Sequence, residues 1–589
     1  MSYLNVPRLT FSGKFYIESA TVNNVPTAFN NETFTPEQAE RNPFNFSPEG
    51  SNDWLLVNCT IKSVTYSDGT STDNPHDDWI IGKTIIGGES RAAAKMADLD
   101  SQQQTATQIW ALTVRIIDED NEVLAGDYAV SPLADTWIRA REGVLLQRLS
   151  VFYHSVLTNL KWNERVLRRS RYLRELYHKA CEKLSIKFNI DGYNSDFNAP
   201  DFAFGRINGT IGPAFAGEPD RFLLGRQFTP EVAITPESLI YFPVNNIWFS
   251  QAIVDQELGK VTIDLGNGLQ DDEVCGNISD YGTLALAVKT ADGTLTELGE
   301  IPYQLPGFID NYAGVATVPA HGKLSKATLA SLEDNPLVIA QKQADGTLTP
   351  LVEESPDGQY VRADQFVSRL NPDQTDTITF YASRYGKPLP NATIRLSQQN
   401  FVLAIIGQGA GPGNPPTGVP ESALTFEASV VTDQNGVATA TLKGTDPGNP
   451  RGYIDGQVYA VFYQLDNVPP VTFAPPAPPT PLLGVNPYNF VSVRIYNSFK
   501  VEGKPTWVKD IEPIFTLYAN LFPLMSRRLI NLADYNEVAE RRQLLRFSFA
   551  LPVSSPGYMP VTRDLSRDKL QAILEWLDTE GPDGLPLFE

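Results

Sequence analysis

The chain is poor in the residues that build disulfide frameworks and metal sites. It has three cysteines and four histidines among 589 residues. Cys59, Cys181 and Cys275 are odd in number and far apart, a spacing that fits neither a disulfide framework nor a close-spaced metal motif. We therefore expect reduced, mostly buried thiols, and no bound metal or other cofactor.

Basic residues and long apolar runs are also scarce. The 47 Lys and Arg are outnumbered by 69 Asp and Glu, which gives a net charge of −22. Nucleic acid is not an expected partner, because a phosphate backbone requires a basic face. No run approaches the ~20 apolar residues of a membrane span, and the N-terminus lacks the apolar core of a signal peptide. A cytoplasmic location is expected, with leaderless export left open.

Proline and glycine are abundant instead. The 44 Pro and 42 Gly, spread along the chain, favour many short strands and turns over long helices. The sequence therefore predicts a mainly β, multidomain fold. The expected units are a first β section at 1–145, a second β section at 146–368 with a basic helix at 164–184, an immunoglobulin-like sandwich at 369–470, a Pro-rich linker at 471–485 and a strand plus helical C-terminal segment at 486–589.

Glycines inside the predicted strands suggest curvature. Residues 8–17 alternate around Gly13, and the strand near 202–213 holds several glycines. Glycine within a strand marks a bulge, a barrel corner or a close backbone approach. The two β sections are therefore expected to be curved, as a barrel or a strongly bent sandwich.

Two turn motifs indicate that the third unit is an immunoglobulin-like sandwich. Residues 386–392 read Gly-Lys-Pro-Leu-Pro-Asn-Ala, and residues 433–438 read Asp-Gln-Asn-Gly-Val-Ala. The Asn-Gly pair predicts a hairpin turn. Both motifs resemble those of the bacterial immunoglobulin-like modules of surface adhesins, and this resemblance implies a seven-stranded sandwich.

Capping residues predict the C-terminal helices. Asp510 is expected to cap a helix that tolerates Pro513 in its first turn and is limited by Pro523. Asp534 and Ser566 are expected to cap the next helix and the last one. The last helix carries one apolar stripe, which we expect to pack on the β domains. The residues of the stripe are Leu570, Ile573, Leu574 and Leu577.

Six residues are candidate ligand-binding positions, and no catalytic constellation can be identified. His76 is followed by Asp77 and Asp78, and a histidine beside two carboxylates can have a raised pKa or bind a cation. The alternative is an ordinary surface loop. Asp98, Asp100 and Gln104 lie in a stretch whose side chains readily bond backbone groups. They would either hold a loop closed or bind a ligand at a barrel mouth.

Both ends of the chain resemble one enzyme family. Residues 7–13 (Pro-Arg-Leu-Thr-Phe-Ser-Gly), 20–24 (Ala-Thr-Val-Asn-Asn) and 558–566 (Tyr-Met-Pro-Val-Thr-Arg-Asp-Leu-Ser) look like segments of the imine dimer synthases that make chromopyrrolate and violacein precursors. In that family the last segment is followed by a ferritin-like domain with Glu and His candidates for iron. Here the sequence runs only to Glu589, and Glu175 with His178 is the one Glu-x-x-His pair, so iron chemistry is not expected.

Three functions follow as hypotheses. The first is a non-catalytic β-rich binding or scaffold protein related to these synthases, working alone or with a separately encoded ferritin-like or other helical partner. The second is a metal-independent cyclase or isomerase of secondary metabolism with a pocket in a β section, where tryptophans are frequent. The third is a structural, secreted or injection-system cargo protein. A packed barrel interior would count against the second hypothesis.

Overall fold

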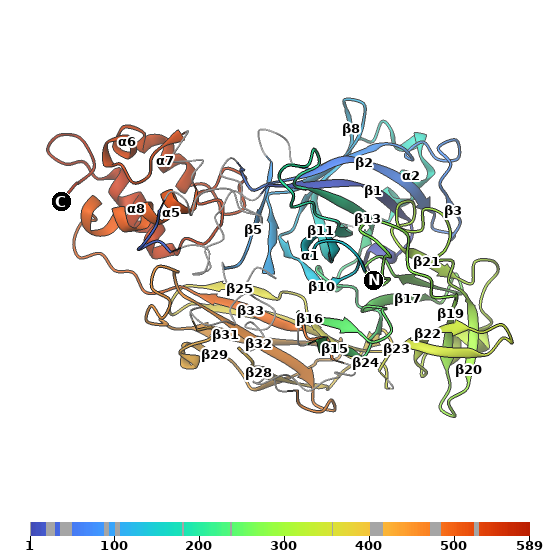
Figure 1. Ribbon diagram of the computed structural model, residues 1–589. Coiled ribbons are helices and arrows are strands. Elements are labelled where there is room, and N and C mark those ends of the chain that lie inside the picture. The colour runs from blue at the N-terminus through green and yellow to red at the C-terminus, as the bar shows by residue number, and fades with distance from the viewer. Residues whose placement is uncertain are drawn as a thin grey trace.

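The protein is built from three β-rich units and one helical unit (Figure 1). The structure, a computed structural model, describes residues 2–18, 30–35, 50–87, 93–100, 106–179, 182–235, 238–355, 357–400, 416–471, 485–522 and 529–589. The helical unit lies at one end of the molecule, the barrel and a second β unit lie at the other, and the sandwich runs beneath them in this view. The predicted mainly β, multidomain fold is confirmed.

The first unit is a closed barrel of eight antiparallel strands. Its closure comes from β1, which pairs with β13 on one side and with β2 on the other. The order around the barrel is β1 (Arg8–Ile17), β13 (Phe204–Ala214), β12 (Lys183–Asp191), β11 (Leu149–Trp162), β8 (Asn121–Tyr128), β7 (Thr113–Asp118), β4 (Thr84–Gly87) and β2 (Asp53–Thr65).

The barrel interior is a packed apolar core. Phe11, Trp54 and Phe188 are among its fully buried side chains. Gly13 lies where β1 bulges against β2, and a Cβ there would stand 2.6 Å from Cys59 Cα. The close approach expected of a strand glycine is thus present at this position. Because side chains fill the barrel, its lumen is not available as a substrate pocket.

Short elements decorate the barrel. Five strands extend its sheet, namely β3 (Ser71–Thr72), β5 (Ala94–Ala97), β6 (Gln108–Trp110), β9 (Ser131–Pro132) and β10 (Ala134–Ile138). The helical elements are η1 (Ser2–Leu4), α1 (Leu145–Arg148), η4 (Leu167–Arg169) and α2 (Arg171–His178). The basic helix expected at 164–184 is therefore shorter, and two arginines of this segment are paired with carboxylates. Arg171 meets Asp68 and Glu175, and Arg169 meets Asp118.

The second unit consists of two four-stranded sheets that share one core. One sheet holds β14 (Arg226–Phe228), β17 (Ser250–Asp255), β18 (Lys260–Asp264) and β21 (Val315–Val318). The other holds β20 (Leu295–Glu300), β19 (Thr283–Lys289), β22 (Leu337–Lys342) and β23 (Leu348–Glu353). The hairpin of β15 (Val232–Thr235) and β16 (Ser238–Pro243) and helix α3 (Lys326–Ser331) complete it. The expected division at residue 145 falls inside the barrel sheet, because β11 to β13 pair with strands that precede it.

The third unit is a sandwich of two five-stranded sheets. The first sheet holds β24 (Gln359–Ala363), β26 (Thr375–Arg384), β31 (Val437–Gly444), β29 (Leu424–Thr425) and β27 (Lys387–Pro388), with η5 (Glu421–Ala423) before β29. The second holds β25 (Val367–Leu370), β33 (Phe490–Ile495), β32 (Gln457–Leu465), β28 (Thr393–Gln398) and β30 (Ser429–Val431). The sandwich thus extends beyond the expected 369–470, because β33 returns to lie between β25 and β32.

The Asn435-Gly436 turn does not close a hairpin. It follows β30 in one sheet and precedes β31 in the other. Asp433 Oδ1 accepts hydrogen bonds from the backbone N–H groups of Asn435 and Val437, so the chain turns and crosses between sheets. The Pro-rich linker expected at 471–485 lies almost entirely outside the described residues.

The C-terminal unit is helical and has its own core. It comprises a π-turn η6 (Trp507–Ile511), α5 (Glu512–Leu521), α6 (Tyr535–Glu540), α7 (Arg542–Phe549) and α8 (Arg567–Asp578). The predicted caps at Asp534 and Ser566 are confirmed, since each side chain accepts from the backbone N–H three residues later. Asp510 instead lies within the π-turn, and Pro523 is outside the described residues.

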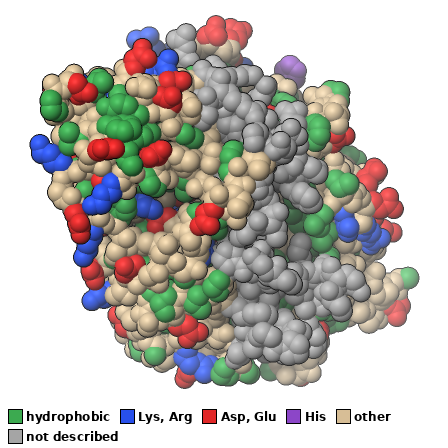
Figure 2. All heavy atoms as spheres, turned by 60° about the vertical axis from the view of Figure 1, so that its left-hand side comes forward, with side chains coloured by type: hydrophobic (Ala, Val, Ile, Leu, Met, Phe, Trp, Pro, Cys, Tyr) green, Lys and Arg blue, Asp and Glu red, His purple; other side chains and the backbone are tan. Residues whose placement is uncertain are grey.

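The apolar stripe of α8 is buried, but not against the β domains as expected. Ile573 and Leu577 lie in a cluster with Trp507, Ile511 and Phe515 of the same unit. Leu570 and Leu574 are half-buried at its edge. Among the described residues, no helix combines the length and the apolar character needed to cross a membrane. Acidic and basic side chains are interspersed on the face shown in Figure 2 rather than gathered by sign.

Candidate functional site

A polar groove lies on the outer wall of the barrel. Its volume is about 670 Å³, and β1, β2 and β13 form its floor. Side chains alternate across a strand, so the residues that flank the inward Phe11 and Phe15 point outward into the groove. The side chains that line it include Ser12, Lys14, Asn58, Lys62, Gln147, Asn194, Asp201, Phe204, Arg206 and Asp310.

Beneath the groove, the polar face of the barrel is sealed by the second unit. In β12, Ser185, Lys187, Asn189 and Asp191 alternate with apolar residues, yet both faces of the strand are buried. Lys187 Nζ is 2.9 Å from Asp264 Oδ2 of β18. Backbone also approaches closely here, because a Cβ on Gly266 would lie 2.4 Å from Asn189 Nδ2. The junction between the two units is therefore polar and tightly packed.

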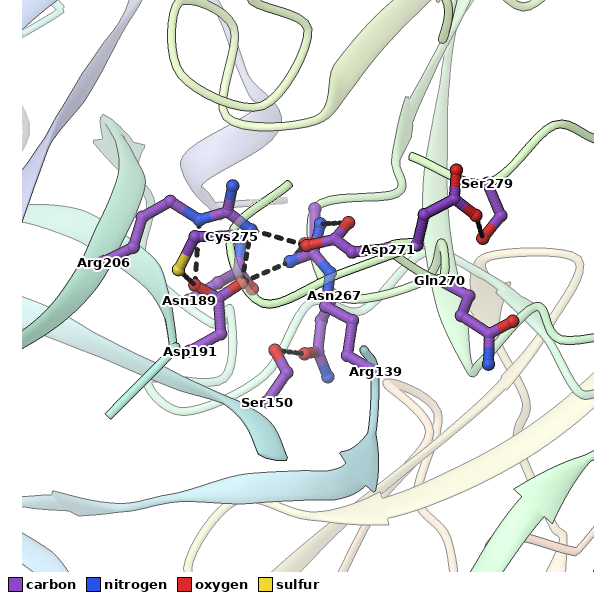
Figure 3. A network of polar contacts seen from close by, with 12 residues as sticks. Arg139, Ser150, Asn189, Asp191, Arg206, Asn267, Gln270, Asp271, Cys275 and Ser279 are labelled. Carbon is purple, nitrogen blue, oxygen red and sulfur yellow. Dashed lines mark hydrogen bonds and ion pairs between the residues drawn. The ribbon is translucent and has the colours of Figure 1, made fainter. Parts of the chain in front are cut away.

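Two arginines and two aspartates form the centre of this junction, and we call them the Arg–Asp square (Figure 3). Arg139 follows β10, Asp191 ends β12 and Arg206 lies in β13, while Asp271 comes from the second unit. The Asp191 carboxylate accepts from Arg139 Nη1 at 2.9 Å and from Arg206 Nε and Nη2 at 2.9 and 2.7 Å. Asp271 Oδ2 lies 2.8 Å from Arg206 Nη2, and its Oδ1 lies 3.1 Å from Arg139 Nη2.

The square balances its own charge. Burial opposes ionisation of Asp191, but the Arg206 and Arg139 guanidinium groups outweigh it and leave the pKa of this carboxyl below its usual value. Burial raises the pKa of Asp271, an effect that the same two arginines offset only in part. The two carboxylates hold the pKa of Arg206 well above its usual value against the opposing effect of burial. Such a group of paired charges is suited to holding structure together rather than to moving protons.

Cys275 stands at the rim of the groove beside the square. Cys275 is exposed, whereas the sequence predicts mostly buried thiols. Cys59 is buried as expected. Burial of the sulfur and the nearby Asp191 carboxylate raise the pKa of the Cys275 thiol to about 12. Because the thiolate is the nucleophilic form, Cys275 is a poor nucleophile at neutral pH. Cys181 lies outside the described residues.

The candidates near residue 76 do not converge on a site. His76 and Asp77 are exposed, and Asp77 Oδ2 accepts from Thr72 Oγ1 at 2.7 Å. Asp78 is buried and its Oδ2 accepts from the Tyr172 backbone N–H at 2.9 Å, at the start of α2. Asp78 thus positions the helix against the loop, and His76 lies apart from it on the surface.

Asp98 and Asp100 lie at the junction of the barrel and the sandwich, and Gln104 is outside the described residues. The Asp100 carboxylate is fully buried and forms two hydrogen bonds with Arg451, at 2.9 and 2.7 Å. Burial raises the pKa of the Asp98 carboxyl to about 7, and Asp100 adds to the shift, although Thr107 donates a hydrogen bond to Asp98. The placement of Asp100 favours the loop-ordering interpretation, and ligand binding by these residues stays a prediction.

The raised pKa of Asp98 gives a testable pH dependence. Its folded pKa lies above the unfolded one, so between about pH 4 and pH 7 the folded state holds more protons and stability falls as the pH rises. We expect Asp98→Asn to remove this fall and to stabilise the protein above pH 7 by about 1–3 kcal/mol, since one pKa unit corresponds to about 1.4 kcal/mol and the half-buried carboxyl is partly screened. Urea unfolding at pH 5 and pH 8 measures it. The same change at the exposed Asp120 should leave the pH profile unaltered.

Sequence reasoning did not identify the Arg–Asp square. Its four members are separated by up to 132 residues and belong to no motif. One local signal was present, namely the strict alternation in β12 that ends on Asp191. Alternation indicates one polar face, but it does not tell whether water or a second unit covers that face.

The fold and the groove define a mainly β, multidomain protein with an immunoglobulin-like sandwich. No protein-family model matches the chain, and no curated protein does. Solved structures with local likeness include the Bacteroides thetaiotamicron EndoBT-3987 with Man5GlcNAc product (13% identity, 27% of this chain and 38% of that chain, TM-score 0.17). Others are the D00-D0 domain of Intimin (11%, 35% and 88%, TM-score 0.14) and domains 4 and 5 of the S-layer protein SbsC (9%, 46% and 98%, TM-score 0.15). At these scores, none of them lends its function to this chain.

Proposed function

We propose that this protein is a non-catalytic β-rich binding scaffold and that the groove on the outer wall of the barrel is its binding surface. The Arg–Asp square is the observation that carries this proposal. The ionisable groups most deeply placed beneath the groove neutralise one another across the junction of two units. Groups held in this way stabilise a shape, while a general base or nucleophile needs a free lone pair near the substrate.

The groove itself has the chemistry of a binding site for a polar acid. Lys14 and Lys62 come from adjacent strands, and within the described part of the chain neither lies at ion-pair distance from a carboxylate. Asn58 supplies an amide group and Phe204 supplies an aromatic surface. The Asn194 amide donates to Asp201 and accepts from Gln147. A volume of about 670 Å³ is that of a small-molecule site. An acidic sugar would match these groups, with its carboxylate toward the lysines and its hydroxyl groups toward Asp201 and Asp310, which also line the groove.

This proposal predicts binding without turnover. We expect equilibrium dialysis to show retention of glucuronate over glucose, and mass spectrometry to recover the glucuronate unchanged. The Lys14→Ala/Lys62→Ala double variant should bind at least tenfold more weakly, because both cations are lost. Lys504→Ala, at an exposed lysine near the helical unit, is the matched control. A chemically altered ligand, or equal retention by the double variant, would contradict the proposal.

We also propose, on the sequence resemblance alone, a relation to the imine dimer synthases and a separately encoded helical partner. The resemblance at residues 7–13 and 558–566 supports it. Native mass spectrometry of the protein drawn from its source cell is the test, and recovery of free monomer alone would count against a partner. The cytoplasmic location and the cargo alternative stay predictions that cell fractionation can decide.

A further inference from the structure

A second cleft lies between the barrel sheet and the sandwich. Its volume is about 280 Å³, and it is separate from the groove on the barrel wall. Strands β6 and β9 of the barrel sheet form one side and β25 of the sandwich forms the other. The polar side chains that line the cleft include Gln108, Arg221, Ser368, Arg369 and Asp376, and the indole of Trp110 lines it as well.

Among the described residues, Arg369 in this cleft forms no ion pair with a carboxylate, although Asp564 and Asp98 lie near enough to interact with its charge. Its Nη1 donates to Gln108 Oε1, and its Nη2 reaches the Asp98 backbone carbonyl at 3.5 Å. Its Nε is buried and has no hydrogen-bond partner. By contrast, Arg451 and Arg494 at the same junction both meet the Asp100 carboxylate. Arg369 therefore differs from these two arginines in making no direct ion pair within the described part of the chain.

A second arginine that forms no ion pair with a described carboxylate lies on the same indole. The guanidinium carbons of Arg369 and Arg563 are 5.4 and 5.7 Å from the Trp110 ring centroid. Arg563 is 2% exposed, donates to the backbone carbonyls of Val561 and Ser555, and keeps a buried Nε without a partner. Trp110 Nε1 is also buried and has no hydrogen-bond partner among the described residues. Within that part of the chain, three N–H donors without a partner and two cations without a direct ion pair thus gather around one ring.

The pKa values of both arginines are lowered, as expected for buried cations without a direct ion pair. Burial lowers the pKa of Arg563 to about 10, and repulsion from Arg369 adds to the shift. Burial likewise lowers the pKa of Arg369. Contact with an aromatic face only partly replaces the solvation that a buried cation loses. An anion placed beside Arg369 would compensate both cations.

We propose that this cleft binds the oxyanion of a small acid, with Arg369 as the binding cation and Trp110 Nε1 as an additional donor. Arg563 raises the positive potential at the site through its position on the same indole. Asp376, which accepts from Ser368 Oγ at 2.6 Å, faces the cleft as well. The ligand therefore bears one acidic group that faces Arg369. Its other end carries a hydroxyl or ammonium group, which can lie beside the Asp376 carboxylate. The oxyanion is either inorganic phosphate or the carboxylate of a small organic acid.

Thermal melts of the whole protein with phosphate, glycolate or chloride at equal ionic strength and pH 7 test the proposal. We expect phosphate or glycolate to raise the melting temperature in a saturable way, because a ligand bound only by the folded state stabilises it. Phosphate alone identifies a phosphate site, and glycolate alone identifies a carboxylate site. The proposal is overturned if neither anion raises the melting temperature more than chloride does. This result requires no variant protein.

Variants then place the anion in the cleft. Arg369→Gln should weaken the anion response at least tenfold and, without added anion, should melt no lower than the natural protein, since the cation that is removed makes no direct ion pair. The exposed Arg384→Gln is the matched control. The Lys14→Ala/Lys62→Ala variant should keep the full response, which separates this cleft from the groove. An unchanged response in Arg369→Gln, or loss of the response in the lysine variant, assigns the anion elsewhere and overturns the proposal.

Discussion

Arg139→Ala is expected to lower the free energy of unfolding by about 3–5 kcal/mol, because it leaves two buried carboxylates without one of their two cations. Arg139 is 1% exposed and bonds both Asp191 and Asp271 of the Arg–Asp square. Its Nη1 also donates to the Gly266 backbone carbonyl of the second unit at 2.9 Å. The loss should appear in urea unfolding followed by tryptophan fluorescence, and as faster hydrogen exchange at the ends of β12 and β13.

The neighbouring Arg141 provides the control. Its side chain is half exposed, and its Nη1 lies 3.8 Å from Asp272 in a loose surface pair. Arg141→Ala should cost less than about 1 kcal/mol, as exposed ion pairs do. If Arg139→Ala and Arg141→Ala destabilised the protein equally, the square would not be holding the barrel to the second unit, and the scaffold proposal would lose its main support.

Local features of the fold could be predicted from the sequence, whereas long-range pairing could not. Asp534 and Ser566 cap helices as expected, because a cap depends only on residues three positions apart. The barrel closes through β1 and β13, whose residues are nearly 200 positions apart. No local pattern specifies such a partner, so a division at residue 145 separated strands that belong to one sheet.

The same limit applies to the candidate sites. Asp78 and Asp100 stood out in the sequence because carboxylates were clustered, and both turned out to be buried and bonded to other elements. The proposed anion site depends on Trp110, Arg369 and Arg563, and each of these residues belongs to a different unit of the fold. What distinguishes Arg369 is that no described carboxylate forms an ion pair with it, and an absence in space leaves no trace in sequence spacing.

The helical unit gives the second large effect. Trp576→Ala should cost about 3–5 kcal/mol, because a fully buried indole leaves a cavity that its neighbours cannot close. Trp576 is 0% exposed and contacts Trp507, with 5.4 Å between ring centroids. Its Nε1 also donates to the Leu587 backbone carbonyl at 2.7 Å and so holds the end of the chain. We expect calorimetry to show a separate transition at lower temperature for this unit, with the barrel transition unchanged.

The control for Trp576→Ala is Leu574→Ala on the same helix. Leu574 is only half-buried at the edge of the core, so its truncation should cost about 1–2 kcal/mol and leave the transitions merged. The contrast tests where the helix packs. If α8 were held mainly by the β domains, either variant would shift the barrel transition as well. Because the core around Trp576 is built from residues of the helical unit, the barrel should melt at its original temperature in both variants.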